Sequence, residues 1–334
     1  MNTILILTIL IVVFAVVFDF INGFHDTANA IATSVSTKAL QPRHAIILAS
    51  VMNFIGAMTF TGVAKTITKD IVNPFTLENG TTVILAALLA AIIWNLITWY
   101  YGIPSSSSHA LIGSIAGAAI AASGFHSLNY GGFLNIIKAL ILSPLLAFAV
   151  GFIVYGIIKV IFKNSNLTKT NKNFRRVQIA TAALQAYSHG TNDAQKAMGI
   201  ITMALMVNNY QESNDIQLWV QTICALAMAC GTAIGGWKII KTVGGKIMKI
   251  RPVSGVAADL TGATVIFGAT FIGLPVSTTH VISSSILGVG ASHRLKGVKW
   301  GTAKTMVITW LITLPISATL AAICFFLLNL FFER

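Results

Sequence analysis

Long apolar runs recur along the chain and are separated by short polar segments. Since a helix needs roughly 20 apolar residues to cross about 30 Å of hydrocarbon, each long run is a candidate membrane helix. The runs lie at 3–18, 44–62, 83–101, 110–123, 134–158, 218–237, 260–274 and 305–330. The pattern predicts eight or more helical segments. With 55% hydrophobic and 9% charged residues, against about 25% charged in a soluble domain, the chain is expected to be an all-α polytopic membrane protein.

The basic residues are concentrated in a few of the polar segments. Four segments hold 17 of the 22 lysines and arginines, namely 38–44, 159–176, 238–251 and 294–304. Three others are poor in basic residues, namely 63–80, 124–133 and 207–217. The positive-inside rule places the first group in the cytoplasm and the second outside. The formal net charge of +13 therefore reports membrane topology, and no nucleic-acid partner is expected.

This charge pattern gives the two halves of the chain opposite orientations. Segment 81–123 leaves the outside and returns to it as a hairpin, whereas 252–291 is a hairpin that begins and ends inside. We expect a first repeat at 1–162, a basic cytoplasmic linker at 163–176 and a second repeat at 177–334. The inversion also predicts an external N-terminus.

Two pairs of sequence motifs support an internal repeat. Asn22-Gly-Phe-His-Asp-Thr-Ala-Asn-Ala30 matches His189-Gly-Thr-Asn-Asp-Ala-Gln-Lys-Ala197, with the shared Gly, Asp and final Ala each 167 positions apart. Gly102-Ile-Pro-Ser-Ser-Ser-Ser-His109 matches Gly273-Leu-Pro-Val-Ser-Thr-Thr-His280 at an offset of 171. The second pair falls at the tips of the two predicted hairpins.

Gly-x-Pro followed by hydroxyl residues ends one helix and caps the start of the next. The hairpin tips are therefore expected to be broken, re-entrant helices at membrane depth. Paired interrupted helices in inverted repeats are typical of alternating-access transporters, whose sites lie near the bilayer midplane. The predicted fold is two inverted-topology repeats whose broken helices meet there.

A helix start offers unpaired backbone N–H groups and a partial positive charge, which together favour an anion. Added hydroxyl donors suit a tetrahedral oxyanion such as phosphate. The candidate phosphate ligands are the hydroxyls of both tips and one amide from each acidic motif, namely Ser105, Ser106, Ser107, Ser108, Ser277, Thr278, Thr279, Asn29 and Gln195.

Asp26 and Asp193 lie in apolar surroundings, where an unpaired carboxylate is costly. Cations are therefore expected beside them, and mutual stabilisation of anion and cation would couple their transport. Sodium prefers oxygen ligands, which the two acids, Asn29 and Asn192 can supply together with unwound backbone carbonyls. Protons remain an alternative, because four histidines also fall in the repeated motifs. Lys196 could pair with Asp193, bind the anion, or only neutralise a buried acid.

Simpler interpretations exist for the same residues. The acids could hold neighbouring helix ends, and the serine runs could be polar packing residues between membrane helices. The three cysteines, at 224, 230 and 324, lie inside apolar runs without metal-ligand spacing and are interpreted as small apolar residues.

The acidic motifs and proline-serine tips, in their order along the whole chain, resemble the inorganic phosphate transporter (PiT) family. The resemblance implies cation-coupled phosphate uptake across the plasma (inner) membrane by a multi-pass homodimer, driven by sodium in many members and by protons in others. It ties Asp26 and Asp193 to transport and cation binding, with sodium as the coupling ion and no other cofactor. Lys196 stands opposite Asn29 in the repeat, so the two half-sites need not bind the same ions.

Other functions are less well supported by the residues. Another tetrahedral oxyanion, notably sulfate, would fit the same donors. An intramembrane aspartyl protease could use two membrane aspartates, but the Tyr-Asp and Gly-x-Gly-Asp sequences typical of such enzymes are missing. A serine hydrolase is disfavoured because there is no Gly-x-Ser-x-Gly elbow. We therefore expect a transporter and no enzymatic activity.

Overall fold

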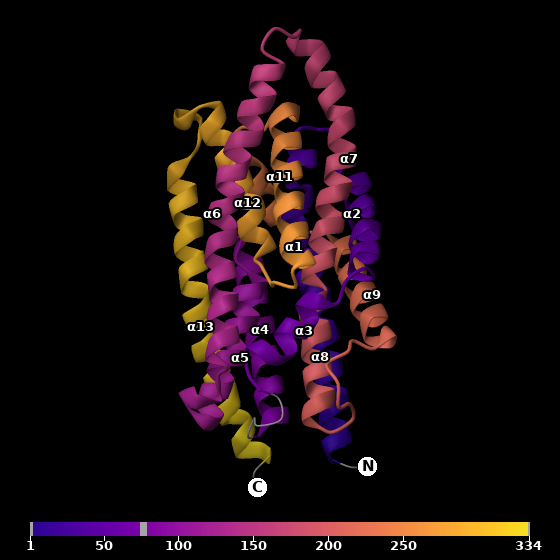
Figure 1. Cartoon of the computed structure of the whole chain (residues 1–334), viewed down its shortest axis with the longest axis vertical. Coiled ribbons are helices and arrows are strands. Elements are labelled where there is room, and N and C mark those ends of the chain that lie inside the picture. Colours follow the sequence, from indigo (N-terminus) through magenta and orange to yellow (C-terminus); the bar gives the residue numbers. More distant parts are fainter. Residues whose placement is uncertain (1–2, 74–78, 333–334) are drawn as a thin grey trace.

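The computed structural model describes residues 3–73 and 79–332, and every long element within them is helical (Figure 1). The first half contains α1 (Thr3–Ser36), α2 (Pro42–Ala57), α3 (Gly62–Asp70), α4 (Gly80–Tyr101), α5 (Ser107–Ser123), η1 (Phe125–Ser127) and α6 (Tyr130–Ile161). The second half contains α7 (Leu167–Asp193), α8 (Gln195–Val207), α9 (Leu218–Ile234), α10 (Trp237–Lys246), α11 (Pro252–Phe271), α12 (Thr278–His293), η2 (Leu295–Gly297) and α13 (Trp300–Phe332). The all-α membrane fold is confirmed.

The same order of elements occurs in both halves. The bent pair α2 and α3 meets at 67°, and the pair α9 and α10 meets at 71°. Each half then has a helical hairpin, a short 3-10 turn and a long final helix. Pro144 in α6 and Pro315 in α13 are 171 positions apart, which is the offset of the hairpin tips. In Figure 1, α6 rises from the bottom towards the top, whereas α13 descends from top to bottom.

All eight predicted apolar runs lie in or overlap helices. Five helices of the described chain are long and apolar enough to cross a membrane, or up to seven if each bent pair forms one span. The run at 110–123 lies in α5, a shorter apolar helix. The pattern misses α7 because its exposed first turns carry Lys169, Lys172, Arg175 and Arg176. The predicted linker 163–176 is thus helical from Leu167 onward.

The hairpin tips break where the sequence predicts. Gly102 and Gly273 end α4 and α11 with φ values of 65° and 72°, a left-handed conformation that glycine adopts without a Cβ clash. Ser106 and Ser277 cap the next helices, each accepting the backbone N–H three residues ahead. In Figure 1, α4 and α5 lie in the lower part of the molecule and α11 and α12 in the upper part.

The segments rich in basic residues gather at one end of the bundle. The backbone N–H of Lys299 donates to the carbonyl of Ile247 at 2.9 Å, and the connection from α6 to α7 stands at the same, upper end in Figure 1. Both termini lie at the opposite end, where Asn208 donates to Thr8 at 2.8 Å. The predicted external segment 63–80 belongs to that end, although residues 74–78 lie outside the described chain. This grouping agrees with the sidedness predicted from charge.

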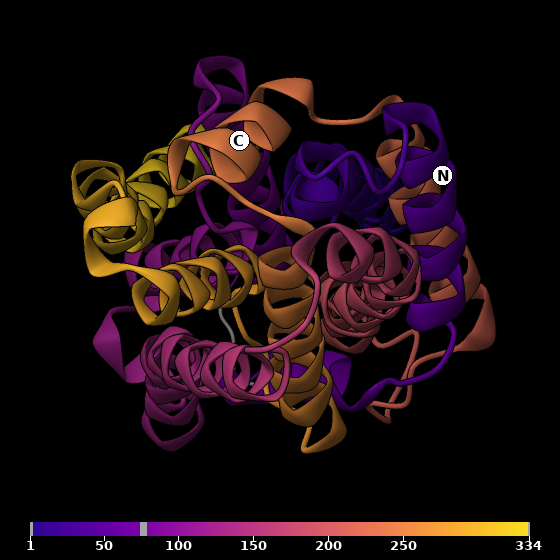
Figure 2. The same ribbon diagram turned by 90° about the horizontal axis from the view of Figure 1, so that it is seen from above.

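The periphery of the bundle suits a lipid solvent. Viewed from above, α13 lies at the left edge and α2 at the right (Figure 2). Large aliphatic side chains on α6 and α13 are exposed, among them Leu145 at 63% and Leu311 at 70%. A bilayer has no water for backbone groups, and the helices of this bundle pair those groups internally while exposing apolar side chains to lipid.

The glycine shared by the acidic motifs has a packing role. A Cβ on Gly23 would strike the backbone of α9 at Met228 and Thr232, and one on Gly190 would strike the backbone of α2 at Asn53. Each half therefore presses its acidic motif against the first helix of the bent pair in the other half. This contact fixes the depth at which the two aspartates lie.

Candidate functional site

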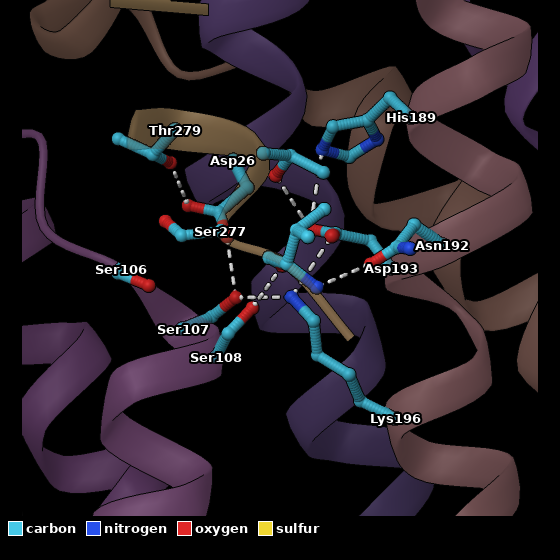
Figure 3. Close-up of polar contacts among 12 residues, drawn as sticks. Asp26, Ser106, Ser107, Ser108, His189, Asn192, Asp193, Lys196, Ser277 and Thr279 are labelled. Atoms are coloured by element: carbon cyan, nitrogen blue, oxygen red, sulfur yellow. Dashed lines mark hydrogen bonds and ion pairs between the residues drawn. The ribbon is translucent and has the colours of Figure 1, made fainter. Parts of the chain in front are cut away.

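The two acidic motifs and the two hairpin tips meet in the interior of the bundle (Figure 3). Asp26 comes from the middle of α1, and Asp193 ends α7. The solvent-exposed fractions of these residues are 1% and 0%. The sequence prediction that residues far apart in the chain converge here therefore agrees with the geometry.

Asp26 is surrounded by donors from both halves. Nδ1 of His25 lies 2.7 Å from its Oδ1, and the hydroxyl of Ser107 in the first tip donates to Oδ2. Thr279 of the second tip donates to Oδ1 at 3.1 Å. Nε2 of His25 contacts the hydroxyl of Thr98 in α4 at 3.0 Å. The carboxylate is thereby held by elements from both repeats.

Asp193 has a related set of partners. Thr278 donates to its Oδ2 at 3.2 Å, and Nε2 of His189 lies 3.3 Å from the same oxygen. Ser107 and Thr278 are 171 positions apart, so each acid takes one hydroxyl from the tip of its own half. Asp193 differs in having an ion pair, since Nζ of Lys196 lies 2.9 Å from Oδ1.

Lys196 joins the two half-sites. Its Nζ donates to the hydroxyl of Ser107 at 2.8 Å, and that hydroxyl donates to Asp26. A continuous polar chain thus runs from Asp193 through Lys196 and Ser107 to Asp26, as the dashed lines in Figure 3 show. Lys196 is 1% exposed, so its ammonium is satisfied entirely within the protein.

Asn29 is connected to Asp26 through Thr279, whose hydroxyl donates to Oδ1 of Asp26 at 3.1 Å. Nδ2 of Asn29 donates to the hydroxyl of Thr279 at 2.9 Å. Its Oδ1 is buried and has no hydrogen-bond donor among the described residues. A buried acceptor without a donor is costly, and an oxygen of this kind beside a carboxylate suits a cation.

The remaining hydroxyls of the tips have other partners. Ser105 donates to Thr98 at 2.8 Å, and Ser108 donates across the site to the carbonyl of Val276 in the second tip at 2.8 Å. The capping serines, Ser106 and Ser277, are both buried. The starts of α5 and α12 are therefore held together, with their first-turn N–H groups beside the acids.

Comparison with known proteins agrees with this geometry. The sequence model of the phosphate transporter family matches residues 22–171 and 163–321. The chain belongs to the phosphate transporter family. It is 79% identical over 333 residues to a Bacillus subtilis (strain 168) protein named "Probable low-affinity inorganic phosphate transporter", covering 99% of this chain and 100% of that protein. A Rhizobium meliloti (strain 1021) protein of the same name is 43% identical over 318 residues, or 95% of each chain.

A solved structure is also similar to this phosphate transporter. It is that of a protein named "The sodium-dependent phosphate transporter", has a TM-score of 0.85 and 26% sequence identity, and covers 97% of this chain and 99% of that one. The molecule is therefore a multi-pass plasma-membrane transporter of phosphate and not an enzyme.

Two of the predicted ligands of the transporter are engaged elsewhere. Gln195 accepts the backbone N–H of Ala64 at 3.0 Å and donates to the carbonyl of Thr191 at 2.5 Å, so its amide satisfies the start of α3 and does not point to the anion donors. Asn192 donates to Thr270 at 2.9 Å and accepts the N–H of Val276 at 3.3 Å. Its amide therefore holds the second tip.

The expectation of unwound carbonyls beside Asp26 is wrong. α1 continues as one helix through the whole first motif to Ser36, so its carbonyls are used in the helix. Only the second motif is interrupted, at Ala194 between α7 and α8. Each motif contains no proline and one glycine, so local composition does not explain why only the second is interrupted.

Several residues around the transporter site carry no motif that would identify them from the sequence. Asn53 donates to Thr27 at 2.9 Å and to Thr232 at 3.0 Å, and its Oδ1 lies 3.1 Å from Nδ1 of His189. The only sign of Asn53 in the sequence is that it is a single amide residue inside the apolar run 44–62. Trp310 is another of these residues, and it stacks on His280 at 4.0 Å. The two tip histidines already expected from the motifs, His109 and His280, lie with ring centroids 4.4 Å apart.

Proposed function

We propose that the chain is a sodium-coupled symporter that carries phosphate into the cell by alternating access. The observation that carries the proposal is the interlocked site, in which anion donors at two helix starts share hydrogen bonds with two buried carboxylates. Anion and cation binding at such a site depend on each other, which is the requirement for coupled transport.

Phosphate would bind between the starts of α5 and α12. The backbone N–H groups there and the hydroxyls of Ser107, Thr278 and Thr279 are neutral donors that match its oxygens. Phosphate would displace the bonds that these hydroxyls now make to Asp26 and Asp193. Asp26 would then need a new positive partner, whereas Asp193 keeps its contact with Lys196, so phosphate binding favours cation binding at Asp26.

Sodium would bind beside Asp26. The carboxylate, the hydroxyl oxygen of Thr279 and the donor-free Oδ1 of Asn29 are hard oxygen ligands from three residues that are joined by hydrogen bonds. The protein of the similar solved structure is named for its sodium dependence, which supports the same coupling ion here. Of the sodium ligands expected from the second half, Asn192 is engaged by Thr270 and Val276, and Oδ1 of Asp193 contacts Nζ of Lys196 at 2.9 Å.

Proton coupling is the second candidate, favoured by one contact. His25 lies 2.7 Å from Asp26 and 3.0 Å from Thr98. A proton could therefore be held between imidazole and carboxylate and be released when the carrier changes conformation. The proton site would consist of His25 and Asp26, whereas the sodium site consists of Asp26 and Asn29.

Uptake of ³²P-phosphate into proteoliposomes tests both versions. An imposed inward sodium gradient should accelerate uptake, and excess unlabelled sulfate should not reduce it. Acceleration by a proton gradient in the absence of sodium would show that the coupling ion is the proton and not sodium. Acceleration by neither gradient would contradict coupled transport, and competition by sulfate would assign a wider oxyanion specificity.

A further inference from the structure

Lys196 and Asn29 are repeat counterparts with different chemistry. Each follows its acid by three positions, and the two are 167 positions apart. Three positions are nearly one helical turn, so both side chains lie beside the carboxylate of their own motif. One half-site therefore has a neutral amide where the other has an ammonium.

The contacts of the two side chains differ accordingly. Asn29 is linked to Asp26 through the hydroxyl of Thr279, and its buried Oδ1 has no donor among the described residues. A free acceptor of this kind is what a bound cation needs. Lys196 instead offers only donors, and its Nζ contacts Oδ1 of Asp193 at 2.9 Å and Ser107 at 2.8 Å. The second half-site thus already contains a positive charge with short contacts to oxygen atoms.

We propose that the Lys196 ammonium is a built-in cation that fills the half-site of Asp193, so that phosphate is coupled to one free cation fewer than two open half-sites would require. This rests on the proposed cation-coupled function. The exchangeable cation then binds only at Asp26, Asn29 and Thr279. Lys196 sets the ion stoichiometry of the carrier.

Charge balance favours this arrangement. Counted over Asp26, Asp193 and Lys196 alone, the formal charge is a single negative one, which one monovalent cation neutralises. Without the ammonium, both carboxylates would need a dissociable partner in a medium where unpaired charge is costly. A tethered cation also has a high effective local concentration, so it remains in the site while the empty carrier returns.

A direct bond from Lys196 to phosphate is the competing role. It would make the ammonium an anion ligand that sodium cannot replace. The contacts favour the counter-ion role, because Nζ is committed to Asp193 and to a hydroxyl that is itself bound to Asp26. The two roles predict opposite responses to sodium when the charge is removed.

The test measures ²²Na and ³²P uptake in the same proteoliposomes. Lys196→Asn gives the second half-site the residue of the first and should raise the number of sodium ions per phosphate by one. Asn29→Lys makes the reciprocal change and should lower the number by one. Lys65→Asn removes an ammonium from a surface pair with Asp215, at 2.6 Å and with side chains 40% and 72% exposed, and should leave the number unchanged.

The outcomes distinguish a failure of this proposal from a failure of sodium coupling. If wild-type uptake proves independent of sodium, sodium coupling fails, yet Lys196→Asn should still acquire sodium flux with phosphate. Folded Lys196→Asn protein with an unchanged flux ratio, or without uptake at any sodium concentration, overturns the proposal. If Lys196→Asn does not fold, an unchanged ratio in Asn29→Lys overturns it.

Discussion

Thr279 is the hydroxyl through which the second hairpin tip reaches the acid of the first half. It accepts from Nδ2 of Asn29 at 2.9 Å and donates to Oδ1 of Asp26 at 3.1 Å, and the residue is 1% exposed. Thr279→Val keeps the shape of the side chain and removes its oxygen. Both neighbours lose a partner that water cannot replace, while Asp26 retains its contacts with His25 and Ser107.

The expected magnitude follows from these bonds. A buried polar group left without its partner costs about 1–3 kcal/mol, and the lost oxygen is also a proposed sodium ligand. Since about 1.4 kcal/mol corresponds to a factor of ten, the sodium concentration for half-maximal uptake should rise roughly 5-fold to 150-fold. The maximal rate at saturating sodium should fall less.

Initial rates of ³²P-phosphate uptake into proteoliposomes over a range of sodium concentrations measure this shift. Thr279→Ser keeps the hydroxyl and should stay close to wild type. Ser108→Ala is the matched control, because Ser108 is the repeat counterpart of Thr279 yet donates to the carbonyl of Val276. A half-saturating sodium concentration in Thr279→Val within twofold of wild type, or a larger shift in Ser108→Ala, would refute the reasoning.

Three further outcomes are expected. Asp26→Asn and Asp193→Asn should each reduce initial uptake at least 100-fold, because breaking a buried charge pair costs about 3–5 kcal/mol; equal uptake in both variants and wild type would exclude the mechanism. Gly190→Val should lower the free energy of unfolding by about 1–3 kcal/mol, seen as a lower melting temperature in detergent, because α2 leaves no space at Asn53. Cross-linking of native membranes should give a band at twice the 35.5 kDa chain mass, and a monomer band alone would contradict the predicted homodimer.

The fold could largely be predicted from local sequence signals. Apolar runs of membrane length mark the long helices, and Gly-x-Pro with following hydroxyls marks both hairpin tips. These signals act within a few residues of the backbone they shape, so the left-handed Gly102 and Gly273 follow from sequence alone. α7 escaped the pattern because its first turns extend as an exposed basic helix, for which hydropathy gives no signal.

The sequence predicts which residues form the site better than it predicts the contacts between them. Asp26, Ser107 and Thr279 could be placed together by repeat symmetry, because the motifs recur at nearly constant offsets. The partner of Gln195, by contrast, is a backbone N–H at the start of α3, which is distant in sequence and becomes close only after the helices pack. Residues such as Asn53 bind across the halves and carry no motif of their own.

The two repeats preserve what helix packing requires and differ where ions bind. Gly23 and Gly190 are the same because each lies against a helix backbone of the other half, and a side chain at either place would separate the halves. Asn29 and Lys196 face the site instead of a backbone, so replacing one by the other changes charge without moving a helix. Duplication can therefore keep one fold in both halves while each half acquires its own ion chemistry, and a carrier can change its coupling stoichiometry through a single side chain.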